Sequence, residues 1–180
     1  VCRQSNNAFN TFVNAGVNHI HGANYMMGST LFPQQLGQAA TFNPELVKRG
    51  SQITAYETRA AGIPWNFSPV LDVGRNPNWS RFFETYGEDP LVCATMGRAC
   101  VDGYQGDSTE PDATHVAACM KHFLGYSGAR TGKDRTPAII SDIELRQIYM
   151  PSFQAAINEG AMSVMINSGE INGIPVHANP

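Results

Sequence analysis

A dense run of side chains that can carry charge or hydrogen-bond lies between Trp65 and Pro90. It begins with an apolar run over residues 65–73, interrupted by Pro69, which indicates a buried parallel strand with a kink or bulge. A non-helical segment follows, and its polar side chains are Asp72, Arg75, Asn76, Asn78, Arg81, Glu84, Glu88 and Asp89. A structural turn rarely needs so many fork-shaped donors and carboxylate acceptors. The composition therefore indicates a site for a polar, hydroxyl-rich ligand.

A second candidate group is Lys121-His122, at the end of the apolar run 116–123. A buried cation is costly unless it is paired with an acid or bound to a ligand. Taken alone, Lys121 would be read as one half of an ion pair and His122 as a core histidine with satisfied hydrogen bonds. Arg81 alone would be read as a partner of Glu84 or Glu88. Together, these three residues favour binding of sugar hydroxyls.

His19 and His21 offer a different chemistry. They are two residues apart on a predicted strand, so we expect them on one face, and His-x-His on a barrel strand is typical of metal-dependent amidohydrolases. His115 and the Lys121-His122 pair could supply further ligands. This alternative gives no role to the segments FPQQLG, GEDP and NGIPVHAN, so we favour the sugar interpretation and expect no metal and no cofactor.

The elements that must position these residues alternate along the chain. Apolar runs predict strands over 17–21, 65–73, 116–123 and 163–167. Cap signals predict the helices between them: Asn43-Pro44 begins one that Gly62 ends, Asp89-Pro90 begins one through Tyr104, and Ser141 with Glu144 begins one that Pro151 kinks or restarts before Gly160. Shorter helices are expected within residues 1–15 and over 34–41. Loops are expected over 105–114, 124–138 and 168–180.

Strands that alternate with helices indicate an α/β fold with a parallel sheet. Polar residues follow the strands, where barrel enzymes build their sites. Roughly four strands cannot close an eight-stranded barrel, so we expect a partial (β/α)8 TIM-type barrel, about half of one. Residues 1–180 show no linker or repeat, which predicts one incomplete N-terminal barrel domain and no second domain in this chain. The chain begins without Met and ends within a motif, so we also expect a fragment.

Composition excludes several partners. The net charge is −3, with 12 Lys plus Arg against 15 Asp plus Glu, and no basic patch with interleaved aromatic residues indicates nucleic acid. No apolar run is long enough to cross a membrane. The four cysteines form no CxxC pair, and Cys93 and Cys100 are too far apart on one helix for a disulfide, so we expect buried free thiols. The segment SGARTGKD (127–134) lacks phosphate-loop spacing.

Five sequence blocks, in order, resemble the N-terminal barrel of family 3 glycoside hydrolases, the β-glucosidase and β-xylosidase family. The resemblance covers most of the chain from about residue 16. The blocks are HIHGAN, TLFPQQLGQAATFNPELV (30–47), NPNWSR with ETYGEDP (76–90), AACMKHFLGYS (117–127) and NGIPVHAN (172–179).

The resemblance implies a set of substrate-binding residues. Arg81 matches the arginine of the family's Trp-Gly-Arg block, although Ser80 replaces the glycine, and Lys121-His122 matches a pair that hydrogen-bonds the terminal sugar. Met165 matches the methionine on the strand before a sugar-side loop. Asn18 stands where the family usually has an aspartate that accepts two sugar hydroxyl protons. An asparagine keeps one acceptor and loses the charge, so binding is weaker or the hydroxyls are presented differently.

The resemblance also implies the reaction, which is exo-acting, retaining hydrolysis of terminal non-reducing β-D-glucosyl residues from a β-linked oligosaccharide or glycoside. The family's nucleophile is an Asp beyond HAN and its acid/base a Glu in a second domain, so no catalytic residue is expected in this chain, and the fragment alone would be inactive or bind sugar only. No histidine lies between Gly125 and Val176 to form the Asp-x-His pair of bacterial N-acetylglucosaminidases, which favours the glucosidase/xylosidase branch. An extracellular or periplasmic location is expected.

Overall fold

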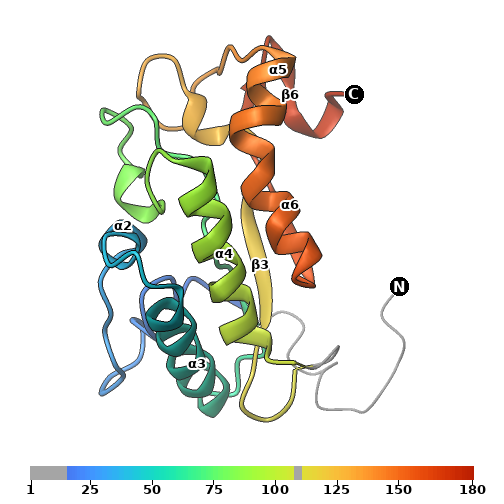
Figure 1. Ribbon diagram of the computed structural model, residues 1–180. Helices are drawn as coiled ribbons and strands as arrows, with labels where there is room; N and C mark the ends of the chain where they lie inside the picture. The colour runs from blue at the N-terminus through green and yellow to red at the C-terminus, as the bar shows by residue number, and fades with distance from the viewer. Residues whose placement is uncertain (1–15, 108–110) are drawn as a thin grey trace.

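The computed structural model describes residues 16–107 and 111–180 (Figure 1). Its main sheet has four strands, and every neighbouring pair is parallel. In both chain order and sheet order they are β1 (Gly16–Val17), β2 (Trp65–Asn66), β3 (Ala117–Phe123) and β4 (Ser163–Ile166). Each connection therefore crosses over to the next strand, which confirms the predicted α/β alternation. The helix expected within residues 1–15 lies outside the described residues.

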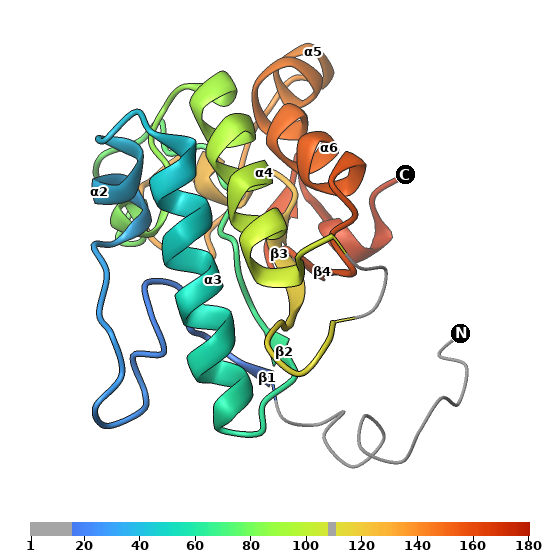
Figure 2. The ribbon, with the colours of Figure 1, turned by 60° about the horizontal axis from the view of Figure 1, so that its bottom comes forward.

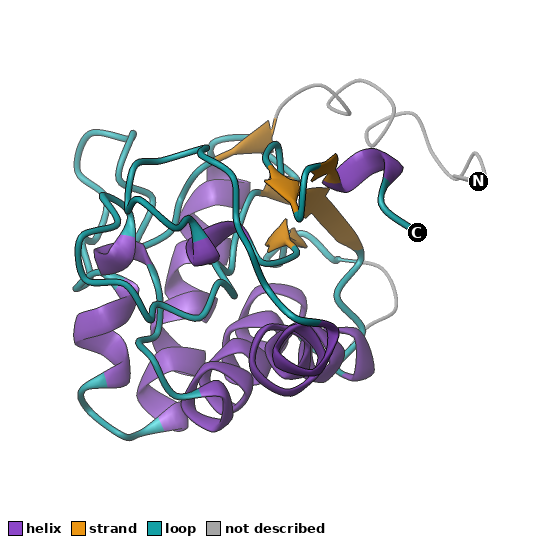
Figure 3. Cartoon of the chain, turned by 90° about the horizontal axis from the view of Figure 1, so that it is seen from above, coloured by secondary structure: helices purple, strands orange, loops and turns teal. Residues whose placement is uncertain are grey.

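The long helices pack side by side on one face of this sheet (Figure 2), and the view from above places them together on one side of the strands (Figure 3). The helices are α2 (Gln35–Ala39), α3 (Pro44–Ala60), α4 (Pro90–Gln105), α5 (Asp142–Glu144) and α6 (Met150–Asn158), with a π-helical turn, η3 (Leu145–Tyr149), between the last two. This is the layering of a barrel wall, with helices outside and strands inside. None of the described helices is long and apolar enough to cross a membrane.

Local capping chemistry fixes where the long helices begin. The Asn43 side chain accepts a hydrogen bond from the backbone N–H of Glu45 at 3.1 Å, and Asp89 accepts from that of Leu91 at 2.7 Å. A proline occupies the first turn of each helix, where its missing N–H is no loss. The predicted starts are confirmed, as is the helix restart at Pro151, which lies in the first turn of α6.

Two predicted strands are shorter than expected. The first ends at Val17 rather than at residue 21, because His19 turns into the interior and its backbone N–H donates to Asn66 Oδ1 at 2.9 Å. The second is a regular strand only at Trp65–Asn66. Its extended backbone still reaches β3 beyond Pro69, because the Leu71 N–H donates to the Lys121 carbonyl at 2.7 Å.

Residues 168–180, predicted as loop, contain a small antiparallel hairpin. It pairs β5 (Glu170–Ile171) with β6 (Ile174–Pro175) around Asn172-Gly173. Both turn residues have positive φ, 54° and 83°, which is the requirement of the tight turn that Asn-Gly favours. The Asn-Gly pair is therefore the sequence signal for this hairpin, and the prediction of a loop over 168–180 is wrong for residues 170–175.

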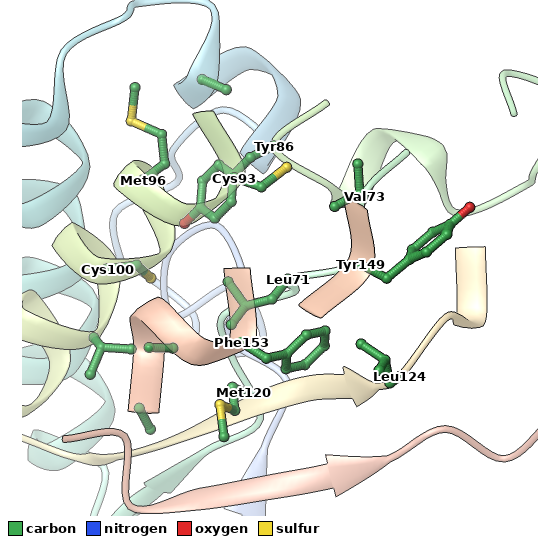
Figure 4. Close-up of a cluster of buried hydrophobic side chains, with 14 of the residues drawn as sticks. Leu71, Val73, Tyr86, Cys93, Met96, Cys100, Met120, Leu124, Tyr149 and Phe153 are labelled. Carbon is green, nitrogen blue, oxygen red and sulfur yellow. The ribbon is translucent and has the colours of Figure 1, made fainter. Parts of the chain in front are cut away.

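The core lies between the sheet and the helix layer (Figure 4). Side chains from β3 and from the segment after β2 meet side chains of α4 and α6. Those labelled in the figure are Leu71, Val73, Tyr86, Cys93, Met96, Cys100, Met120, Leu124, Tyr149 and Phe153. Cys93, Cys100 and Cys119 are buried free thiols, as predicted. Cys2 lies outside the described residues.

Gly103 allows α4 to approach α3 closely. A Cβ at this position would lie 2.4 Å from the Lys48 carbonyl oxygen and 2.6 Å from Ser51 Cβ. Because backbone cannot yield as a flexible side chain does, Gly103→Ala should destabilise the chain by about 1–3 kcal/mol in urea denaturation. Gly50→Ala is the matched control, since its nearest neighbour, Phe32 Cδ1, is 3.7 Å away. That variant should gain about 0.5–1 kcal/mol from helix propensity, and equal effects would contradict this account.

Candidate functional site

Lys121 is a deeply buried cation of the site. It lies near the end of β3 where the register with β4 shifts, and such irregularities re-aim side chains. Its side chain is almost fully buried, and Nζ donates to Asn18 Oδ1 at 2.6 Å. Burial, together with the positive charge of Arg81, lowers the pKa of Lys121 to about 8. Among the described residues no carboxylate forms an ion pair with it, so a neutral amide holds this cation.

His122 is held by a carboxylate on one side and approached by a guanidinium on the other. Its Nδ1 is 2.8 Å from Asp72 Oδ2, which also accepts the His122 backbone N–H at 3.1 Å. Its Nε2 is 3.3 Å from Arg81 Nη1. Because a carboxylate only accepts, Nδ1 donates in the hydrogen bond to Asp72. Asp72 thus orients His122.

Arg81 is fixed by a bidentate ion pair with Glu84. Its Nε and Nη2 donate to the two carboxylate oxygens at 2.8 and 2.7 Å. Burial acts to lower the pKa of Arg81, but the hydrogen bonds and charge of Glu84 outweigh it and raise that pKa above its ordinary value. The guanidinium carbon also lies 5.6 Å from the centre of the Tyr126 ring, within cation–π range. The arginine pairing that the sequence offered as a structural alternative therefore exists, and it leaves Nη1 turned toward His122.

These residues converge on one cavity of about 290 Å³. Its lining is Asn18, Ile20, His21, Asn24, Tyr25, Gln34, Arg81, Phe83, Glu84 and Lys121. Asn18 and Lys121 are 103 positions apart in sequence. They are in contact because the parallel sheet places the ends of their strands side by side. Arg81 and Lys121 thus lie at one cavity, while His122 contacts Arg81 without being part of the lining.

Met165 is not in the lining of this cavity, where the sequence placed it. Met165 is the register partner of Lys121 on β4, so it projects from the same face of the sheet, but one strand farther along. Arg75, from the same polar segment as Asp72, is about half exposed, and its Nη1 lies 3.9 Å from Glu144 Oε1. It does not organise the pocket as Asp72 does.

His19 and His21 do not share a face. Because the strand ends at Val17, two-residue alternation does not extend to them. His19 is buried with Nδ1 at 2.7 Å from Thr58 Oγ1, and burial lowers its pKa, while His21 lines the cavity with Nδ1 at 3.0 Å from the Phe32 carbonyl. Within residues 16–107 and 111–180, no three His, Cys, Asp or Glu side chains are grouped to hold a metal ion. The expectation that the two histidines share one face is therefore wrong.

Comparison with known families decides the assignment. The model of the glycosyl hydrolase family 3 N terminal domain matches residues 2–180. The chain belongs to glycoside hydrolase family 3. The alternative assignment to the metal-dependent amidohydrolases is therefore wrong.

Curated relatives in family 3 differ in substrate. The lysosomal beta glucosidase of Dictyostelium discoideum is 48% identical over 169 residues, which are 91% of this chain and 21% of that protein. A beta-xylosidase of Formosa agariphila is 40% identical, covering 86% of this chain and 22% of the relative. A periplasmic beta-glucosidase of Salmonella typhimurium is 34% identical over 81% of this chain and 19% of its own length. The chain thus spans about a fifth of each relative.

Solved structures agree with the fold. The β-glucosidase of Listeria innocua superposes with a TM-score of 0.84 at 38% identity, over 89% of this chain and 22% of that one. Structures of that enzyme with glucose and with isofagomine match equally well. The four parallel strands and their helices are therefore part of the family 3 N-terminal barrel.

Proposed function

We propose that this chain supplies the sugar-binding wall of an exo-acting, retaining β-glucosidase. The observation that carries the proposal is the convergence of Asn18, Arg81 and Lys121 on one cavity. Residues 1–180 are proposed to be one part of a single barrel domain, and the whole protein to work outside the cytoplasm. The lysosomal and periplasmic names of two relatives support that location.

Each residue has a role that its chemistry suits. The Lys121 ammonium has three N–H donors and gives one to Asn18, so the other two can donate to hydroxyls of the terminal sugar. Arg81 Nη1 offers a further charge-assisted donor, and its pairing with Glu84 keeps the guanidinium in place. Asp72 holds His122, and His122 in turn positions Arg81. Met165 is proposed to contact the sugar from the neighbouring strand, β4.

The test is an assay of the protein encoded by the complete reading frame that contains residues 1–180. Aryl β-D-glucoside and aryl β-D-xyloside should be compared as substrates, and NMR of the first-formed sugar should show the β-anomer. We expect turnover of the glucoside with retention. A protein that hydrolyses neither glycoside would overturn the proposal, and higher kcat/KM for the xyloside would assign it to the xylosidase branch.

The polypeptide of residues 1–180 alone should not turn over aryl glucosides. Retaining hydrolysis needs two carboxyl groups about 5–5.5 Å apart. The two carboxylates described at the site are engaged, Glu84 by Arg81 and Asp72 by His122. Release of nitrophenol should equal the buffer blank, while NMR titration with glucose should still shift pocket resonances. Turnover that Glu84→Gln abolishes would contradict this, and binding without turnover even in the complete protein would favour a purely sugar-binding role.

Activity of the complete protein should not need a metal ion. The Nδ1 atoms of His19 and His21 already face Thr58 and the Phe32 carbonyl. Dialysis against EDTA should change kcat/KM less than about twofold, because the proposed reaction uses carboxylates only. Stoichiometric zinc that survives dialysis and is lost in His21→Ala would show that this expectation is wrong.

A further inference from the structure

His19 is a buried histidine next in sequence to Asn18, and it cannot itself reach a ligand. Its side chain is fully buried, and Nε2 is screened from solvent with no partner in the described part of the chain. Burial lowers the pKa of His19, which the charge of Glu57 opposes, so the ring is neutral at pH 7. Any contribution of His19 to the site must therefore come from what it holds in place.

The His19 ring is fixed to α3 by a hydrogen bond whose direction follows from its neighbours. Its Nδ1 lies 2.7 Å from Thr58 Oγ1. The Thr58 hydroxyl has a single proton, which it donates to the Thr54 carbonyl at 2.6 Å. Thr58 Oγ1 therefore accepts from His19, and Nδ1 carries the proton of the neutral ring.

The Asn66 side chain holds both backbone groups of the same histidine. Asn66 Oδ1 accepts the His19 N–H, and Asn66 Nδ2 donates to the His19 carbonyl, each at 2.9 Å. Asn66 is fully buried on β2, the partner strand of β1, and the C-terminal half of α3 lies beside both strands (Figure 2). The ring and the backbone of His19 are thus held from two different elements.

Holding His19 also restrains Asn18. Regular strand structure ends at Val17, and the exposed Asn18 side chain lines the cavity, where its Oδ1 accepts from Lys121 Nζ at 2.6 Å. The peptide plane that carries the His19 N–H also contains the Asn18 Cα. Fixing that N–H therefore restrains the point from which the Asn18 side chain reaches Lys121.

We propose that His19 and Asn66 are positioning residues that hold Asn18 in contact with Lys121. This rests on the proposed function, in which the cavity around Lys121 binds the terminal sugar. Both positioning residues are fully buried, so neither contacts the sugar and both act through Asn18.

The first test compares Asn66→Ala with the wild type in the protein from the complete reading frame. With Asn18 no longer held, kcat/KM for 4-nitrophenyl β-D-glucoside should fall by about 3- to 30-fold. The alkaline limb of the pH–activity profile should move down by about 0.5–1 pH unit, because an acceptor at Nζ favours the charged form of Lys121. The variant leaves unchanged the other groups that act on the Lys121 pKa, which are Arg81, Glu84, Asp72 and Cys119.

Gln105→Ala is the matched control, because Gln105 is another buried amide that holds backbone groups. It is 3% exposed at the end of α4 and lies outside the cavity lining. Its Nε2 donates to the Gly160 carbonyl at 2.9 Å, and its Oε1 accepts the Ala118 N–H at 3.0 Å. Gln105→Ala should lower thermal stability but leave the alkaline limb in place. An unchanged limb in Asn66→Ala would overturn the proposal.

Substitutions of His19 test the ring separately. His19→Asn keeps a side-chain N–H that can donate to Thr58, so its alkaline limb should stay near that of the wild type. His19→Ala should shift the limb in the same direction as Asn66→Ala, and it keeps the Asn66 amide, so it serves as the test if Asn66→Ala does not fold. Equal limbs in His19→Asn and His19→Ala would remove the ring from the positioning role.

A double-mutant cycle shows whether the effect passes through Asn18. In an Asn18→Ala background, adding Asn66→Ala should change neither the limb nor kcat/KM further, because the side chain to be positioned is gone. A further loss as large as that in the wild-type background would assign Asn66 to general stability and reject the positioning role.

A crystal structure of the complete protein carrying Asn66→Ala, or His19→Ala, tests the contact without any activity. We expect Asn18 Oδ1 to lie beyond hydrogen-bonding distance of Lys121 Nζ, more than about 3.5 Å away. An unmoved Asn18 would contradict the proposal even if kcat/KM falls. If the wild type hydrolyses no glycoside, the proposed function fails, and this structure still decides whether Asn18 is held by His19 and Asn66.

Discussion

Replacing Lys121 with alanine should lower kcat/KM of the complete protein on an aryl β-glucoside by about 10- to 150-fold. A hydrogen bond from a charged donor contributes about 1.5–3 kcal/mol, and here it forms in a cavity base that is almost closed to water. The cation also holds the terminal sugar in the position from which it reacts, so kcat should fall along with kcat/KM.

Lys48→Ala is the control for this substitution. Lys48 is a partly exposed lysine on α3 that pairs with Asp102 at 2.8 Å, and it lies outside the cavity lining. A surface ion pair contributes about 0–1 kcal/mol to stability and nothing to sugar binding. The kcat/KM of Lys48→Ala should therefore stay within about twofold of that of the wild type. Similar losses in the two lysine variants, at matched thermal stability, would show that Lys121 has no specific role.

The parts of the fold that depend on local chemistry could be predicted from the sequence. Asn43-Pro44 and Asp89-Pro90 determine helix starts within one turn of chain, and no distant residue alters that outcome. The first strand was mispredicted because contacts distant in sequence decide it. His19 is drawn into the interior by Thr58 and Asn66, 39 and 47 positions away.

For the candidate site, too, the sequence indicated some residues, while the roles of others depend on the fold. Residue type indicated Lys121, because a cation at the end of an apolar run needs a partner. It indicated Arg81 because this residue lies in a segment dense in polar side chains. Residue type could not show that Asp72 contacts the site and Arg75 does not, because both lie in the same polar segment. In the fold, Asp72 contacts His122 and Arg75 lies near Glu144.

Replacing Asn18 with aspartate should move the alkaline limb of the pH–activity profile upward. In the wild type the limb is expected near pH 8, because burial and the charge of Arg81 lower the pKa of Lys121 to about 8. Glu84, Asp72 and Cys119 act on Lys121 in the opposite direction without cancelling that shift. The ammonium, and with it the strong donor to sugar, is present below this pH and lost above it.

The Asn18 amide oxygen lies 2.6 Å from Lys121 Nζ, so a carboxylate there would favour the charged form directly. We expect the limb in Asn18→Asp to rise by at least about one pH unit, with lower KM for neutral glucosides because the carboxylate accepts hydroxyl protons more strongly. Asn158→Asp, on the exposed end of α6, should leave the limb where it was.

Stability should respond to pH in the opposite sense. The folded pKa of Lys121 is about 8, below the ordinary value of 10.5, so between these values the unfolded chain binds more protons than the folded one. The contribution of Lys121 therefore makes the wild type more resistant to urea as pH rises from about 8 to about 10.5, while activity falls. In Asn18→Asp that gain should shrink, because the folded pKa moves toward the unfolded one. A limb that stays near pH 8 in Asn18→Asp would show that a group other than Lys121 sets it.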